Sequence, residues 1–215
     1  MHQLVPPFIL RNYAEGNTTG SLPAAGLFVD TSGFSAMTDA LMAHGQHGAE
    51  VLAGVMSATF EPLIRSVFEQ GGFVTSQEGD SFTALFPIDA NPAKSAFHAL
   101  AAAWQIQKIV NRQAKFITPY GEFHIVVKVG LSLGVARWGI ITSARQHRAA
   151  YYFRGQAVEE CVEAEHLAQA GEIILTEAIY QQVQHLVEVD KQGSHFWLQN
   201  VLEEPSPYPS FIQPE

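Results

Sequence analysis

The chain has 215 residues, of which 47% are hydrophobic, and its 21 acidic and 12 basic residues give a formal net charge of −9. A chain of this size can bury one substantial core. The acidic balance and the scattered basic residues disfavour nucleic acid and anionic membranes as partners. The single cysteine excludes an intrachain disulfide, and we find neither a secretion signal nor an uninterrupted apolar run of membrane-spanning length. We therefore expect a cytoplasmic domain without membrane insertion.

Apolar periodicity and turn residues predict an alternation of strands and helices after an irregular N-terminal segment, in which residues 8–10 can dock as a short helix. In the first half of the chain we expect a strand over 26–29, helices over 36–41 and 49–69, a hairpin of strands 73–76 and 81–86, and a helix over 92–115. A strand over 123–135 is then expected to turn into a partner strand over 136–142. The expected C-terminal elements are a strand over 151–153, a helix over 157–168, a strand over 172–175, a helix over 177–185 capped by Thr176, and strands over 187–189 and 195–198.

This order predicts an α+β fold, in which helices cover one side of a mostly antiparallel, ferredoxin-like sheet and extra βα elements follow at the C-terminal end. We expect three parts: an N-terminal extension over 1–22, one folded domain over 23–202, and a proline-rich tail or linker over 203–215.

Two aspartates carry the chemical prediction. Asp30 ends the first strand, and Asp80 lies in the tip of the predicted hairpin. In a ferredoxin-like sheet the first strand lies beside the hairpin, so both carboxylates can converge at one edge of the sheet. The loop from Thr31 to Ser35 then offers backbone N–H groups at a helix start, which suit an anion. Two carboxylates beside an anion cradle predict a site for Mg²⁺ and a polyphosphate. Alternatively, Asp30 caps a helix and Asp80 is an ordinary turn residue.

Several short motifs together resemble the catalytic domain of class III nucleotide cyclases. They are residues 28–35, 71–72, 79–81, 127–134 and 155–158. The resemblance extends over roughly residues 24–200, and residues 153–160 are especially similar to the first of the two cyclase halves of soluble, bicarbonate-responsive adenylyl cyclases.

The resemblance implies a head-to-tail pair of cyclase domains with active sites in the interface. One partner supplies two metal-binding aspartates, which correspond to Asp30 and Asp80, and a metal-binding carbonyl, which corresponds to Thr31. Two Mg²⁺ or Mn²⁺ ions activate the ribose 3′-hydroxyl of ATP for attack on the α-phosphate, and pyrophosphate leaves. The implied phosphate-binding residues are Ser32, Gly33, Phe34 and Ser35.

The other partner of such a pair supplies four groups that this chain lacks. The base-reading lysine corresponds to Ser76, and its acidic or threonine partner corresponds to Tyr152. The ribose-orienting asparagine corresponds to Glu159, and the arginine that stabilises the transition state corresponds to Glu163. The two basic residues of the family's bicarbonate pocket correspond to Ser76 and Val162, which argues against regulation by bicarbonate.

These correspondences predict the metal-bearing half of an adenylate cyclase, inactive alone and completed by a second cyclase domain, supplied downstream in the same polypeptide or in trans. The alternative is a catalytically silent module that binds nucleotide or dimerises within a larger signalling protein. A different two-metal nucleotidyl-transfer fold is a weaker alternative, because it leaves the motif at 155–158 unexplained.

Four acidic residues of the helix over 157–168 form a face that we expect to be solvated or to contact a basic partner domain; they are Glu159, Glu160, Glu163 and Glu165. Cys161 is expected to be a packed thiol. The polar loop with Arg145, His147 and Arg148 is expected to be solvated or, less favourably, to contact phosphate. His44 and His47 are three residues apart, but no further ligand supports a zinc site.

Overall fold

The computed structural model describes residues 5–113, 115–143 and 148–203. The described helices are α1 (Pro7–Ala14), α2 (Phe34–Met42), α3 (Gly45–Glu69), α4 (Pro92–Arg112), α5 (Gln156–Leu167) and α6 (Glu177–Val183), with a 3₁₀ turn η1 (Gln184–Leu186). The strands are β1 (Thr19–Ser32), β2 (Phe73–Glu78), β3 (Ser81–Pro87), β4 (Lys115–Thr118), β5 (Gly121–His124), β6 (Val126–Thr142), β7 (Ala149–Arg154), β8 (Ile173–Thr176), β9 (Val187–Gln192) and β10 (His195–Val201).

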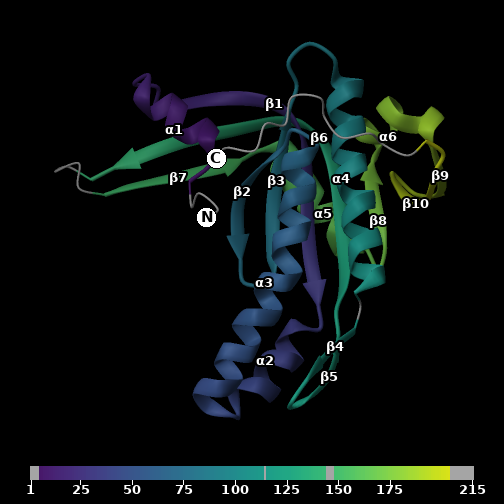
Figure 1. Ribbon diagram of the computed structural model, residues 1–215. Coiled ribbons are helices and arrows are strands. Elements are labelled where there is room, and N and C mark those ends of the chain that lie inside the picture. The colour runs from purple at the N-terminus through teal and green to yellow at the C-terminus, as the bar shows by residue number, and fades with distance from the viewer. Residues whose placement is uncertain (1–4, 114, 144–147, 204–215) are drawn as a thin grey trace.

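The main sheet has the strand order β2-β3-β1-β6-β8-β10-β9, and β7 pairs with β6 outside this path. The pair of β6 and β8 is parallel, whereas the other pairs of described strands are antiparallel. The long helices α3 and α4 lie in front of the sheet in Figure 1, and α5 lies behind it. The α+β fold with a mostly antiparallel sheet and extra C-terminal elements is therefore confirmed, although helices lie on both faces of the sheet.

Strand β1 is central because its neighbours are β3 on one side and β6 on the other. Successive side chains of a strand point to opposite faces of the sheet. Leu27 and Val29 are fully buried in the main core, together with residues of α3 and α4 such as Leu63 and Leu100. Gly26, the residue before Leu27, faces the other side and lies under α5, where a Cβ would be only 1.8 Å from the carbonyl oxygen of Ala157. The carboxyl end of β1 is thus fixed on both faces.

Helix α3 is long and apolar enough, by length and composition, to cross a membrane. In this structure it contributes core residues such as Val55, Phe60, Leu63 and Val67, which pack with the sheet and with α4. The core helix of a globular protein passes the same test, so α3 alone is weak evidence for a membrane segment.

The prediction that residues 136–142 turn back as a partner strand was wrong. They continue β6, which runs over 17 residues, and the partner that follows is β7. The reason lies in β1, which begins at Thr19 and pairs with β6 as far as Gly139, giving the second half of β6 a full backbone ladder. The hairpin of β4 and β5 was not predicted, and its strands begin where the helix over 92–115 was expected to end.

The described part of the N-terminal segment is not irregular, which corrects the expectation for residues 1–22. Helix α1 packs on the sheet through Phe8, whose ring centroid lies 5.5 Å from that of Phe73 and 5.4 Å from that of Trp138. The expected boundary between residues 22 and 23 falls within β1. Thr176 occupies the N-cap position of α6, but its side chain makes no capping hydrogen bond.

Candidate functional site

Asp30 and Asp80 lie on adjacent backbone segments at one edge of the sheet. Asp30 pairs in register with Ser81 of β3, so Asp80, the residue before Ser81, lies beside Thr31. The backbone N–H of Thr31 donates to the carbonyl oxygen of Asp80 at 3.0 Å, and the hydroxyl of Thr31 donates to the same oxygen at 2.6 Å. Thr31 is buried and Asp80 is half-buried, and this double contact holds the turn that carries Asp80 at the end of β1.

The strand does not end at Asp30 as expected: β1 continues to Ser32, and the N–H of Thr31 is already bonded to the Asp80 carbonyl. The loop begins only after Ser32, and Gly33 and Phe34 shape it. Gly33 is the N-cap of α2 and has a φ of +108°, and a Cβ at this position would lie 2.2 Å from the carbonyl oxygen of His124. Phe34 is buried, and its ring centroid lies 5.6 Å from that of Phe60. Ser32 ends β1, and Ser35 is exposed in the first turn of α2. The loop therefore has one defined conformation at a helix start, and its predicted phosphate-binding role remains a prediction.

Lys128 is a charged neighbour of Asp30 that the sequence analysis missed. It lies directly opposite Asp30 on β6, and its ammonium nitrogen is 3.1 Å from Oδ2 of Asp30. The same ammonium group forms an ion pair with Glu165 of α5. Burial lowers the pKa of Lys128, but hydrogen bonds and charge from Glu165 and Asp30 outweigh it and hold this pKa above its usual value. The ammonium group is therefore charged at neutral pH.

Glu165 corrects the expectation of a solvated acidic face on α5. Its side chain is only 2% exposed, whereas Glu159 and Glu163 are exposed. A spacing signal could have found this difference. Glu165 is eight residues after Ala157 and four after Cys161, on the stripe that α5 turns toward the sheet. Lys128 carried no comparable signal, because its place opposite Asp30 follows from strand register.

The residue types at this edge fit a hard divalent cation. The candidate ligands are carboxylate and carbonyl oxygens, which Mg²⁺ and Mn²⁺ prefer. Asp30 is 27% exposed and already holds a cationic group, the Lys128 ammonium, against Oδ2. Among the described residues, no three His, Cys, Asp or Glu side chains gather as a ready-made metal centre. Asp30, Asp80 and the carbonyl of Thr31 would hold a metal only together with oxygens from nucleotide or water.

Three of the four degenerate family positions make local contacts, and the fourth, Glu163, is exposed on α5. Ser76 is on β2, opposite Thr83 and beside a register shift. The ring of Tyr152 on β7 lies close against Gly139 and 5.7 Å from the guanidinium carbon of Arg154. Glu159 accepts a 2.9 Å hydrogen bond from the backbone N–H of Gly155 at the start of α5.

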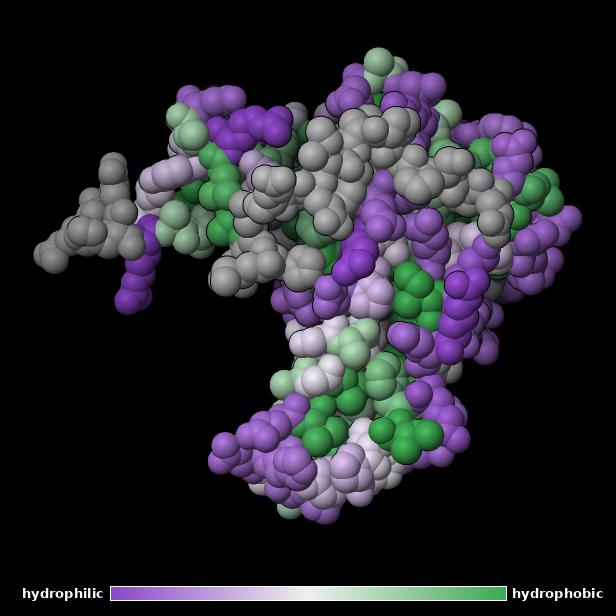
Figure 2. Space-filling view, viewed as in Figure 1, coloured by the Kyte–Doolittle hydropathy of each residue, from purple (hydrophilic) through white to green (hydrophobic). Residues whose placement is uncertain are grey.

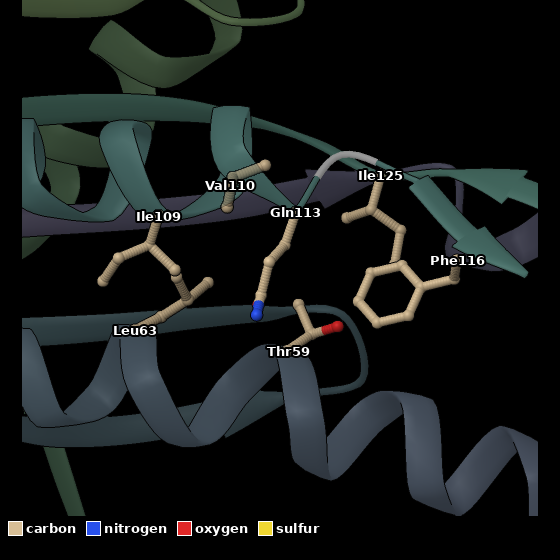
Figure 3. A pocket seen from close by; sticks show the side chains of 7 residues that line it. All are labelled: Thr59, Leu63, Ile109, Val110, Gln113, Phe116 and Ile125. Atoms are coloured by element: carbon tan, nitrogen blue, oxygen red, sulfur yellow. The ribbon is translucent and has the colours of Figure 1, made fainter.

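Two hollows in the described part of the chain lie elsewhere. One, of about 10 Å³, lies between α3, α4 and β4, and the side chains of Thr59, Gln113 and Phe116 converge on it (Figure 3). This volume holds one water molecule at most. The other, of about 290 Å³, lies where β3 ends and α4 begins, and Gln70 and His98 line it. Asp80 precedes the opposite end of β3, so the second hollow is not part of the candidate site. None of the predicted metal- or phosphate-binding residues lines the first hollow.

The remaining sequence expectations have mixed outcomes. Burial raises the pKa of the Cys161 thiol to about 12, as expected for a packed thiol. The ring of His44 stacks on Tyr120 at 3.9 Å, and that of His47 lies edge-on to Tyr120 at 5.8 Å. Arg145 and His147 lie outside the described residues.

The visible surface mixes polar and apolar side chains, with apolar areas around α2, α3 and the β4–β5 hairpin (Figure 2). Met42 and Ile117, which are respectively 52% and 80% exposed, lie on these elements.

Comparison with known proteins supports the interpretation of the fold. No protein-family model matches the chain. Adenylate cyclase type 10 of Homo sapiens is 24% identical over 157 residues, which are 72% of this chain and 9% of the human protein. The chain thus corresponds to a small part of that curated relative.

Two solved structures show the same fold. The crystal structure of the adenylyl cyclase CyaB from P. aeruginosa has a TM-score of 0.72 and 16% identity, and the match covers 87% of this chain and 99% of the crystallised chain. The guanylate cyclase domain of RhGC from Catenaria anguillulae, solved in complex with GTP, has a TM-score of 0.68 and 15% identity over 85% of this chain and 99% of that domain. Sequence and structure comparisons agree: the chain has the fold of nucleotide cyclase catalytic domains and is similar in sequence to part of adenylate cyclase type 10.

Proposed function

We propose that this domain is the metal-bearing half of an adenylate cyclase site, which converts ATP to cyclic AMP and pyrophosphate only when a second cyclase domain completes it. The observation that carries the proposal is the double hydrogen bond from Thr31 to the Asp80 carbonyl, which fixes Asp80 beside the end of the strand that carries Asp30. This contact continues the antiparallel ladder of β1 and β3, and it brings the two acidic residues to the same end of that strand pair.

Asp30, Asp80 and the Thr31 carbonyl are the proposed ligands of Mg²⁺ or Mn²⁺. When bound, the metal would neutralise phosphate charge and favour ionisation of the attacking hydroxyl group. The chain's own contribution is positional: the ladder between β1 and β6 and the Thr31 contact hold the two aspartates, and Gly33 sets the loop for the terminal phosphates. Lys128 adds a cation at the same edge, which suits a polyanionic substrate.

A second domain is required in this proposal because four groups are replaced. Glu163 puts an anion where a cation is expected to stabilise the transition state. Two like charges about 4 Å apart at a partly wet site repel by roughly 4 kcal/mol. We therefore propose a head-to-tail dimer with a different cyclase domain, which supplies the lysine, asparagine and arginine. ATP is preferred over GTP in this proposal because the sequence relative found is an adenylate cyclase.

The alternative is a catalytically silent module that binds nucleotide or dimerises. One observation favours it: Glu159 already serves as a hydrogen-bond partner for the Gly155 backbone at the start of α5, so this position has a structural role without catalysis. Retention of Asp30 and Asp80 beside each other favours the enzymatic proposal.

A complementation assay tests the proposal. The domain is mixed with a cyclase domain that carries the base-reading, ribose-orienting and transition-state residues but has both of its own metal aspartates replaced by asparagine. With Mn²⁺ and ATP, we expect cyclic AMP from the mixture and none from either domain alone. Asp30→Asn in this chain must abolish that activity. A properly associated mixture that makes no cyclic AMP would favour the silent module.

A further inference from the structure

We propose that Glu165 is a positioning residue that draws the Lys128 ammonium away from Asp30 and thereby keeps the Asp30 carboxylate available to a divalent cation. This inference rests on the proposed metal site, and it adds a residue of α5 to the machinery of that site. Glu165 would not touch metal or nucleotide and would act through Lys128 alone.

The geometry gives Lys128 two competing carboxylates. Its ammonium nitrogen is 3.1 Å from Asp30 Oδ2, and it forms a close ion pair with Oε1 of Glu165. Asp30 is 27% exposed, whereas Glu165 is 2% exposed. Asp30 can therefore exchange its cation for one that arrives from solvent, but Glu165 has little access to any other cation.

Two glycines fix the distance between Glu165 and Lys128. A Cβ at Gly130, two residues after Lys128 on β6, would lie 1.9 Å from the carbonyl oxygen of Cys161 and 2.5 Å from the backbone nitrogen of Glu165. A Cβ at Gly26 on β1 would collide with Ala157 in the same helix. Because both positions lack side chains, α5 lies directly on β1 and β6 and brings Glu165 to the lysine. The serine hydroxyl of Ser132 also donates to the Ala157 carbonyl at 2.6 Å.

The consequence for metal binding follows from charge. With Asp30 as its sole partner, the Lys128 ammonium would repel a divalent cation and occupy the oxygen that the cation needs. Glu165 supplies a second, buried negative charge, so Lys128 remains paired when a cation displaces it from Asp30. Of the other titratable groups near this pair, His166 lies 3.9 Å from Glu165 and is 70% exposed.

The test measures binding of Mn²⁺ alone, without nucleotide, by the electron paramagnetic resonance signal of free Mn²⁺. The variants are Glu165→Gln, Lys128→Met, the double variant, and Glu165→Asp, which keeps the charge. Glu177→Gln is a matched control, because Glu177 pairs with Lys191 at an exposed site. Near-ultraviolet circular dichroism establishes that each variant is folded.

We expect Glu165→Gln to weaken Mn²⁺ binding about tenfold, because Lys128 then competes fully for Asp30. Lys128→Met should tighten binding about tenfold, and Glu165→Asp should stay within about threefold of the unmodified chain. The double variant should match Lys128→Met within about threefold, because Glu165 acts only through the lysine.

An effect of Glu165→Gln that persists in the Lys128→Met background would overturn the inference, as would unchanged affinity in Glu165→Gln. If the Glu165→Gln variant does not fold, the Mn²⁺ affinity of Lys128→Met is the deciding measurement. Unchanged or weaker Mn²⁺ binding by Lys128→Met would contradict the proposal. Asp30→Asn separates this inference from the proposed function. Mn²⁺ binding that survives Asp30→Asn would refute the metal site itself, whereas loss in Asp30→Asn with no effect of Glu165→Gln would refute only the role of Glu165.

Discussion

Two groups of residues singled out by the same family resemblance have different environments in this fold. At the end of β1, Asp30 is joined through Lys128 to the buried Glu165, and Thr31 is tied to Asp80. At the degenerate positions, Glu159 and Tyr152 make local contacts at the surface of α5 and β7. A buried ion pair is weak evidence for stability by itself, because desolvation opposes it. Its presence beside Asp30 is therefore better explained by the site, whereas the contacts of Glu159 and Tyr152 are explained by local structure.

The largest loss of stability is expected from a substitution that forces α5 away from the sheet. Gly130→Val would place side-chain atoms inside the backbone of α5, because even a Cβ would lie 1.9 Å from the Cys161 carbonyl. We expect a loss of at least about 3 kcal/mol in the free energy of unfolding, measured by urea denaturation. Gly54→Ala on the open face of α3, where an added Cβ meets nothing within 4 Å, is the control and should stabilise slightly. Equal stability of the two variants would contradict the close packing of α5.

Removing the Lys128 charge should cause the next largest loss in the free energy of unfolding. Lys128→Met leaves Glu165 buried without its cation, and we expect a loss of roughly 3 kcal/mol in unfolding free energy at pH 7. The control is Arg65→Met on α3, which removes an exposed ion pair with Glu61 and should cost less than about 1 kcal/mol. Thermal and urea denaturation of both variants measure this difference, and a similar small loss in both would mean that the Glu165 pair is effectively solvated.

Substitutions at the degenerate positions of α5 should change the free energy of unfolding only slightly. Glu159→Ala removes the hydrogen bond to the Gly155 N–H and should cost about 0.5–1 kcal/mol. Glu163→Ala should change the free energy of unfolding by less than about 0.5 kcal/mol, because the side chain is exposed. A loss above about 2 kcal/mol in either variant would show a structural role that the contacts do not explain.

The smallest expected effect is the chemical modification of the Cys161 thiol, which lies on the same helix. Burial raises the pKa of this thiol to about 12, so less than about 0.01% is thiolate at pH 7. We expect no measurable modification of the folded domain by iodoacetamide over an hour, and complete modification in urea. Rapid modification without denaturant, followed by mass spectrometry, would show that α5 opens readily from the sheet.

Much of the fold could be predicted from sequence because hydrophobic periodicity marks the long elements. The spacing of Leu63, Ile64 and Val67 predicted α3, and the turn residues before Asp80 predicted the hairpin of β2 and β3. The extent of β6 could not be predicted, because it depends on the early start of β1 at Thr19. Short polar strands such as β4 carry little periodic signal.

Of the candidate site, the sequence predicted that Asp30 and Asp80 lie at one edge of the sheet, and in the structure their backbones are neighbours there. Their role as metal ligands stays a prediction. Lys128 could not be found in the same way. Its position opposite Asp30 requires the register between β1 and β6, and a lysine between two valines in a strand is compatible with an ordinary solvated face. Glu165 was misjudged because its acidic neighbours suggested a solvated surface.

The measurement that tests the central claim most directly is a titration of Mn²⁺ and a non-hydrolysable ATP analogue against the unmodified domain and the Asp30→Asn/Asp80→Asn variant. We expect binding of the analogue to the unmodified domain only when Mn²⁺ is present, and no binding to the folded variant at the same concentrations. Metal-independent binding, or equal binding to both proteins, would contradict a metal–nucleotide site built on Asp30 and Asp80.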